Sequence, residues 1–257
     1  MNRVIALLAG VLLALPLVAA PESTPASASA LEVTSARRVS PWKLVLNDQF
    51  NTGPFPAHWA RYKGPYGSDP HNCAIPQHAF VSKGFMRMVF RYRTSGECGA
   101  GWYSAGMVLA KEYESVDQKI SMRFRIQTFK GVRAHWIIPM RWPSNGEWPS
   151  GGEEDYCEGG GSWGCSSYMH GPKKRAWKDY DVDMSKWHTW TFVRRGYTVR
   201  VFIDGRQRWV HRGSPATLPA TLKRPVLQQE CRMFGCPKGK VGSQSILVDW
   251  IKIWNPR

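Results

Sequence analysis

The residues best suited to chemistry are four acids that fall within six positions, Glu153, Glu154, Asp155 and Glu158. The chain is otherwise basic, with 19 Asp and Glu against 35 Lys and Arg, so this concentration of acids stands out. Like charges placed side by side destabilise a fold unless neighbouring groups or a reaction use them. Paired carboxyl groups can serve as nucleophile and general acid or base, as in the hydrolysis of glycosidic bonds.

The spacing of three of these acids suits a bulged β-strand. Side chains alternate between the faces of a strand, so Glu153 and Asp155 point the same way. Glu158 would face the opposite side of an unbroken strand, but a β-bulge around residues 156–157 returns it to the first face. The outer Cα atoms would then lie roughly 13 Å apart, and a concave sheet could bring their carboxyls to the about 5–5.5 Å of a retaining glycosidase.

Short β-strands must position this run. Residues 61–78, 99–102 and 173–183 carry turn-forming or charged residues and are predicted as loops. Asp204-Gly205 is a strong hairpin signal. Many short strands without a long amphipathic helix predict an all-β sandwich, with strands expected at 85–93, 118–126, 135–140, 187–193, 198–203, 225–229 and 245–254.

The pattern Glu153-x-Asp155-x-x-Glu158, preceded by Trp148-Pro149 and Gly152, resembles the active-site signature of glycoside hydrolase family 16 in its bulged, laminarinase-like form. The resemblance runs in order from about residue 42 to residue 254. It implies a catalytic domain over residues 42–257. It also implies a β-jelly roll of two curved antiparallel sheets with a concave substrate cleft.

The resemblance also implies a role for each acid of the signature. Glu153 is expected to be the ionised nucleophile and Glu158 the general acid, which later acts as the base. Asp155 is expected to assist by sharing a hydrogen bond with Glu153. Glu154 departs from the apolar residue usual at its position, so we expect it to face away from the cleft and to find an Arg or Lys partner.

Aromatic residues around the run are candidates for substrate binding. Most of the 13 Trp are expected in the core, since Trp is a large core residue as well as a platform for sugar rings. By resemblance, Trp136 could floor the cleft or lie in the core, and Trp142 and Trp148 could line its edge. Trp163 is a further candidate. His170 could bind a sugar hydroxyl, orient Asp155 or be merely structural.

The first 30 residues resemble a secretory signal peptide, with a basic start, an apolar run over 4–20 and cleavage expected after Ala28 or Ala30. Residues 31–41 are predicted as a linker. This predicts a secreted protein, extracellular or at the cell wall, without stable membrane insertion after cleavage. An uncleaved anchor is the alternative.

Six cysteines in an oxidising compartment predict disulfides, and six cysteines allow 15 pairings. We favour pairing between sequence neighbours, although a zinc site and other connectivities stay open. A bond from Cys157 to Cys165 would brace the bulge; otherwise Cys157 packs on the far side of the sheet. The favoured pairs are Cys73 with Cys98, Cys157 with Cys165, and Cys231 with Cys236.

The net charge of +16 raises the possibility of a nucleic-acid partner, but the basic residues are scattered and no nucleic-acid-binding motif accompanies them. We therefore expect no nucleic-acid partner and a monomer that acts on a polysaccharide. An anionic glycan or cell wall is the alternative source of attraction. No cofactor and no catalytic metal are expected, while a structural calcium near Asp249 stays open.

The predicted function is endo-acting, retaining hydrolysis of internal β-glycosidic bonds, with a β-1,3-glucan or related β-glucan as the favoured substrate. The alternatives are a galactan or other anionic glycan, of the agar or carrageenan kind, and transglycosylation with the same residues. A non-catalytic carbohydrate-binding jelly roll is an alternative of another class, but such proteins lack the catalytic acids.

Overall fold

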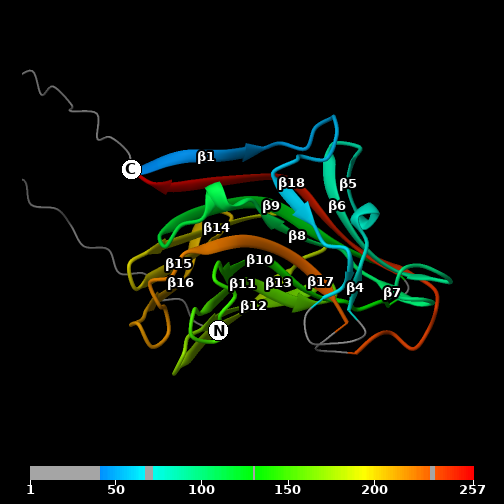
Figure 1. Ribbon diagram of the computed structural model, residues 1–257. Coiled ribbons are helices and arrows are strands. Elements are labelled where there is room, and N and C mark those ends of the chain that lie inside the picture. The colour runs from blue at the N-terminus through cyan, green and yellow to red at the C-terminus, as the bar shows by residue number, and fades with distance from the viewer. Residues whose placement is uncertain (1–40, 67–71, 130, 232–234) are drawn as a thin grey trace, which may run out of the picture. The chain divides into compact units, whose positions relative to one another are not determined.

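Two antiparallel β-sheets lie face to face in the computed structural model, which describes residues 41–66, 72–129, 131–231 and 235–257 (Figure 1). The predicted signal peptide (1–30) and residues 31–40 of the predicted linker lie outside the described residues. No helix in the described ranges is long and apolar enough to cross a membrane.

The first sheet has nine strands within the described residues, in the order β16-β15-β14-β9-β18-β6-β5, with β1 paired to β18 and β7 paired to β6. Its strands are β1 (Trp42–Asp48), β5 (Ala79–Ser82), β6 (Phe85–Arg93), β7 (Gly101–Tyr103), β9 (Gln118–Phe129), β14 (His188–Arg195), β15 (Thr198–Ile203), β16 (Arg206–Arg212) and β18 (Ser243–Pro256).

The second sheet, over the same ranges, has seven strands in the order β13-β12-β11-β10-β17-β8-β2. They are β2 (Trp59–Arg61), β8 (Gly106–Leu109), β10 (His135–Pro143), β11 (Glu153–Gly160), β12 (Trp163–His170), β13 (Arg175–Asp183) and β17 (Lys223–Glu230). A small hairpin, β3 (Gly64–Pro65) with β4 (Cys73–Ala74), and two 3₁₀ turns, η1 (Pro76–His78) and η2 (Lys111–Tyr113), complete the described elements. This is the predicted all-β jelly roll.

Alternation of side chains explains why the central strands form. In β9, Ile120, Met122, Phe124 and Ile126 are buried, whereas Lys119, Arg123 and Arg125 on the other face are partly exposed. Such a period of two suits a strand that packs one face on a core and leaves the other to solvent. The strand predicted at 118–126 is confirmed and extends to Phe129.

The prediction of a loop over 173–183 is wrong, because residues 175–183 form the nine-residue strand β13. β13 is an edge strand that pairs only with β12 in the described sheet, and most of its side chains are exposed. Tyr180 is its one buried residue. A charged edge strand has little apolar alternation, and its charges protect the open edge from pairing with other chains.

Large aromatic side chains fill the space between the sheets. Phe124 of β9 meets Trp136 of β10 edge-on, with ring centroids 6.5 Å apart. Tyr156 of β11 stacks on Phe192 of β14 at 4.4 Å. Full burial of an apolar side chain of this size contributes roughly 1.5–3 kcal/mol, so these contacts hold β10 and β11 firmly against the first sheet.

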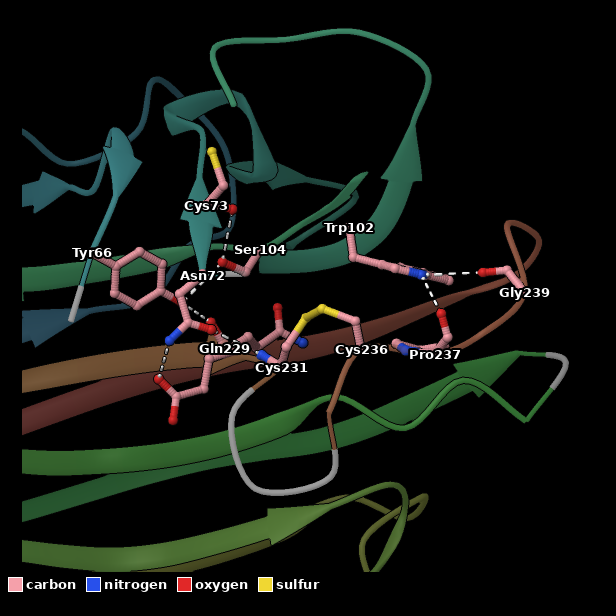
Figure 2. Close-up of a disulfide and its surroundings, with 11 residues drawn as sticks. Tyr66, Asn72, Cys73, Trp102, Ser104, Gln229, Cys231, Cys236, Pro237 and Gly239 are labelled. Carbon is pink, nitrogen blue, oxygen red and sulfur yellow. Dashed lines mark hydrogen bonds between the residues drawn. A yellow bond between two sulfur atoms is a disulfide. The ribbon is translucent and has the colours of Figure 1, made fainter. Parts of the chain in front are cut away.

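The three disulfides of the structure join Cys73 with Cys98, Cys157 with Cys165 and Cys231 with Cys236. The pairing of sequence neighbours is therefore confirmed. Figure 2 shows the Cys231–Cys236 bond next to Asn72, whose side-chain oxygen accepts a hydrogen bond from the Cys231 backbone N–H at 3.1 Å. Nearby, Trp102 Nε1 donates to the carbonyls of Pro237 and Gly239 and fastens the loop that follows.

Candidate active site

The three acids of the signature lie on one strand, β11, and face one cavity. The register of β11 against β12 shifts between Asp155 and Glu158, where three steps on β11 match two on β12. Tyr156 and Cys157 are consecutive, and both belong to the core cluster between the sheets. The predicted bulge is therefore present, and it returns Glu158 to the side of Glu153 and Asp155.

Two glycines of the run are required by close approach. Gly152 has φ +69°, and a Cβ there would lie 2.6 Å from Pro219. A Cβ on Gly159 would lie 2.7 Å from the Trp136 ring. The glycines that flank the acids thus allow the backbone at both ends of the acidic run to lie close to its neighbours.

Glu153 is held by the indole of Trp148, whose Nε1 donates to Glu153 Oε2 at 2.8 Å. Asp155 is fully buried, and His170 Nε2 lies 3.2 Å from Asp155 Oδ2. His170 comes from β12, directly opposite Glu153 in the register. Of the roles predicted for His170, the structure therefore provides the contact that orients Asp155.

Burial dominates the titration of this pair of acids. Burial, followed by the charge of Asp155, raises the pKa of Glu153 to about 9, although His170 and the Trp148 hydrogen bond oppose the shift. Burial and the charge of Glu158 raise the pKa of Asp155 as well. Because two neighbouring carboxyls, one buried and one half-buried, do not both ionise readily, Glu153 and Asp155 retain a proton between them near neutral pH.

Glu158 contacts a histidine that the sequence analysis did not single out. His135 Nε2 lies 2.7 Å from Glu158 Oε1, and His135 Nδ1 lies 2.8 Å from Glu230 Oε1. His135 is the neighbour of Trp136 on β10, so it must face the cavity if Trp136 faces the core. Alternation could have revealed His135, but Glu230 reaches the site from β17, a strand distant in sequence.

A cavity of about 270 Å³ collects these groups, and it is lined by His135, Ile137, Trp148, Glu153, Asp155, Glu158, His170 and Glu230. A second hollow continues from Glu158 towards β12 and β13 and is lined in part by Trp163, Tyr168 and Asp179. The two hollows share Glu158, so the acid lies where they meet.

The predicted aromatic contacts divide between the cavities and the core. Trp148 and Trp163 are exposed, at 53% and 66%, and line the first and the second hollow respectively. The prediction that Trp136 floors the cleft is wrong: its ring is fully buried against Phe124, and its Nε1 donates to the Gly161 carbonyl. Trp142 packs on the apolar cluster of Ile137, Met140 and Val226 and does not line either hollow.

Glu154 faces the core. A cationic partner was predicted for it, and the structure provides three. Arg141 Nη1 donates to Glu154 Oε2 at 2.7 Å, Arg194 donates to Oε1, and Lys223 Nζ lies 3.5 Å from Oε1. The Tyr156 hydroxyl also donates to Oε2 at 2.7 Å. Burial opposes ionisation, but the three cations outweigh it and hold the pKa of Glu154 well below its usual range.

One set of described side chains has the spacing of a cation site. Glu153, Asp155 and His170 each offer one ligand atom, and these atoms lie within 4.8 Å of one another. The same groups already serve each other and Trp148 as hydrogen-bond and charge partners, so we assign no metal to them. Asp249, the residue considered for calcium, accepts a 2.5 Å hydrogen bond from Arg123 Nη1.

The Cys157–Cys165 disulfide joins the bulge to β12, and both cysteines are buried. Replacing both with Ser should relax the bulge that aims Glu158. We expect a lower melting temperature, since loss of a native disulfide typically costs about 2–5 kcal/mol, and a kcat that falls more than KM rises. Thermal unfolding and steady-state kinetics measure both. An unchanged kcat would show that the bulge needs no covalent brace.

Comparison with known proteins supports the fold. No protein-family model matches the sequence, and no curated protein matches it. Solved structures do match. The laminarinase catalytic domain from Thermotoga maritima MSB8 is 20% identical, with a TM-score of 0.70 over 84% of this chain and 99% of that one. The catalytic domain of an endo-1,3-beta-glucanase from Thermotoga petrophila RKU-1 is 21% identical, with a TM-score of 0.69 over 85% and 100%.

SCLam, a non-specific endo-beta-1,3(4)-glucanase from family GH16, is 17% identical, with a TM-score of 0.69 over 85% of this chain and 93% of that one. At these identities the similarity establishes the architecture: the chain has the jelly-roll fold of these laminarinases and endo-β-glucanases, matched over nearly their whole length.

Proposed function

We propose that the protein is a secreted, endo-acting, retaining glycoside hydrolase of family 16 that cleaves internal β-glycosidic bonds of a β-1,3-glucan or related β-glucan. The observation that carries this proposal is the line of Glu153, Asp155 and Glu158 on one face of the bulged strand β11, in a laminarinase-like jelly roll. Three disulfides, with one of their six cysteines exposed and the others buried or half-buried, favour an oxidising compartment and so support secretion.

In the first step, Glu153 attacks the anomeric carbon while Glu158 gives its proton to the glycosidic oxygen of the leaving chain. Glu153 must be a carboxylate for this attack. We therefore assign the proton retained by the pair to Asp155 during the attack, with Asp155 as the donor to Glu153. Trp148 Nε1 supports the same carboxylate from the other side.

In the second step, Glu158 is a carboxylate and removes a proton from a water molecule, which attacks the glycosyl–Glu153 ester and restores the original configuration. Both steps need Glu158 to change charge without moving. The contacts of Glu158 to His135, and of His135 to Glu230, provide a fixed frame for that change.

A panel of polysaccharides tests this function: laminarin, lichenan, agarose and carrageenan, each incubated with the wild-type protein and with Glu153→Gln. Oligosaccharides from laminarin or lichenan with the wild type alone would support the proposal. Products from agarose or carrageenan would move the substrate to galactans, and the net charge of +16 would suit the anionic carrageenan. No product from any of the four would leave a carbohydrate-binding role.

The indole of Trp148 should matter through one hydrogen bond. Trp148→Phe keeps an aromatic ring but removes the donor to Glu153, and a hydrogen bond to a charged group is worth about 1.5–3 kcal/mol, so we expect kcat to fall by roughly 10- to 100-fold. Trp59→Phe is the matched control, because Trp59 Nε1 also donates to a carboxylate at 2.8 Å, that of Asp48, and Trp59 lines neither hollow. Equal kcat values for the two variants would contradict this role.

A further inference from the structure

His135 occupies an unusual position beside the acid/base residue. Its side chain is 3% exposed, and each ring nitrogen meets a carboxylate, Glu158 at 2.7 Å and Glu230 at 2.8 Å. Glu230 is also 3% exposed. A buried imidazole between two carboxylates is held in one orientation, because both of its nitrogens are engaged.

Glu230 is itself fixed from outside the cavity. Gln228 Nε2 donates to Glu230 Oε2 at 2.8 Å, and Asn72 Nδ2 donates to the same oxygen at 3.3 Å. Asn72 Oδ1 also accepts a hydrogen bond from the Cys231 backbone N–H, and the two residues lie side by side in Figure 2. Asn72 and Glu230 each directly precede a disulfide-bonded cysteine, so two disulfides anchor the segments that hold His135.

We propose that His135, held by Glu230, is a positioning residue for Glu158: it fixes Oε1 so that Oε2 is left for the substrate, and its positive charge favours the base form of Glu158. This inference rests on the proposed function, since it assigns a role within the reaction of Glu158. No covalent bond to His135 forms or breaks in this role.

The charge of His135 follows from its neighbours. Burial alone would disfavour the cation, but the hydrogen bonds and charges of Glu158 and Glu230 outweigh burial and raise the pKa of His135 to about 9. The titratable groups that face it are Glu158 and Asp155 from β11 and Glu230 from β17, and Tyr62 in turn faces Glu230. All of the carboxylates favour an imidazolium near neutral pH.

An imidazolium beside Glu158 helps one step and opposes the other. It stabilises the carboxylate that activates water in the second step, and it offers no such support to the neutral acid of the first step. His135→Gln keeps a neutral donor but removes the charge. The alkaline limb of kcat/KM should then move to higher pH by about 1 unit, while kcat at the wild-type optimum falls on the order of 10- to 100-fold because Glu158 is less well held.

The matched control is His188→Gln, because His188 Nδ1 pairs with Asp204 at 2.7 Å on the first sheet, away from the cavity. His188→Gln should leave both the alkaline limb of kcat/KM and the value of kcat unchanged. An alkaline limb of His135→Gln that stays in place, or moves to lower pH, with the melting temperature retained, would overturn the proposal.

An NMR titration of the histidine ring provides a readout that does not depend on activity. His135 in the wild type should titrate near pH 9, and in Glu230→Gln its pKa should fall by at least about 1 unit. Titration of wild-type His135 near the ordinary pH of about 6.5 would contradict the ion pair between His135 and Glu230. Failure of the wild type to hydrolyse any glycan would instead overturn the proposed function, while the titration would still decide whether the pair exists.

Discussion

Replacing Glu153 with Gln is expected to lower kcat on β-1,3-glucan by more than about 10⁴-fold, because an amide cannot form the glycosyl–enzyme ester. Glu158→Gln should also abolish measurable turnover, since general acid assistance alone is worth about 10²–10⁴-fold. Initial rates of reducing-end release from laminarin measure both effects. Full activity in either variant would contradict the assignment of that residue.

Replacing each acid with the smaller residue glycine distinguishes the nucleophile from the acid/base residue. With azide present, Glu153→Gly should yield an α-glycosyl azide, because azide enters from the face that the nucleophile has vacated. Glu158→Gly should yield a β-glycosyl azide, because azide attacks the covalent intermediate from the face of the acid/base residue. The same anomer from both variants would contradict the assignment of separate faces to Glu153 and Glu158.

Loss of activity in Glu153→Gln should not come from loss of the fold. The pKa of Glu153 is raised in the folded protein, so above its ordinary pKa the carboxyl ionises more readily in the unfolded state, and this lowers the free energy of unfolding. A neutral Gln removes that cost. The melting temperature of Glu153→Gln at pH 7 should therefore equal or exceed that of the wild type.

The largest effect on stability is expected at Glu154. Glu154→Gln leaves Arg141, Arg194 and Lys223 buried around a neutral group. Removing one side of a buried ionic cluster typically costs about 3–5 kcal/mol, and we expect a loss of that order in the free energy of unfolding, measured by denaturant titration. The control is Glu97→Gln, whose exposed pair with Lys63 at 3.8 Å should contribute less than about 1 kcal/mol.

The pH dependence of that loss has a definite sign. The folded pKa of Glu154 is depressed below the ordinary value of 4.5, so its stabilisation is present above about pH 4.5 and is lost as the pH falls. The gap in stability between the wild type and Glu154→Gln should therefore narrow in acid. A gap that is constant from pH 7 to pH 3 would contradict the ionic origin of the effect.

Local patterns predicted much of the fold and of the acids' arrangement. Alternation located β9, the Asp204-Gly205 turn located the β15–β16 hairpin, and the spacing of Glu153, Asp155 and Glu158 predicted the bulge. Each of these features depends on residues that are neighbours in the sequence. Two of the three favoured disulfides are local in the same way, with separations of 8 and 5 residues, whereas Cys73 and Cys98 lie 25 residues apart.

Features that depend on contacts distant in sequence were missed. β13 lacks the apolar alternation of a half-buried strand because it lies at an open edge. The face on which Trp136 lies depends on how β10 packs, and the same orientation that buries Trp136 turns His135 towards Glu158. Glu230 lies 95 residues from His135, so no local pattern joins them.

The stereochemistry of the first product tests the central claim most directly. Proton NMR spectra recorded during the first minutes of laminarin hydrolysis resolve the anomeric signals before mutarotation equalises them. The arrangement of Glu153 and Glu158 predicts that the new reducing end appears first as the β-anomer, with the α-anomer growing in later. Initial release of the α-anomer would show inversion and would contradict the proposed role of Glu153 as a nucleophile.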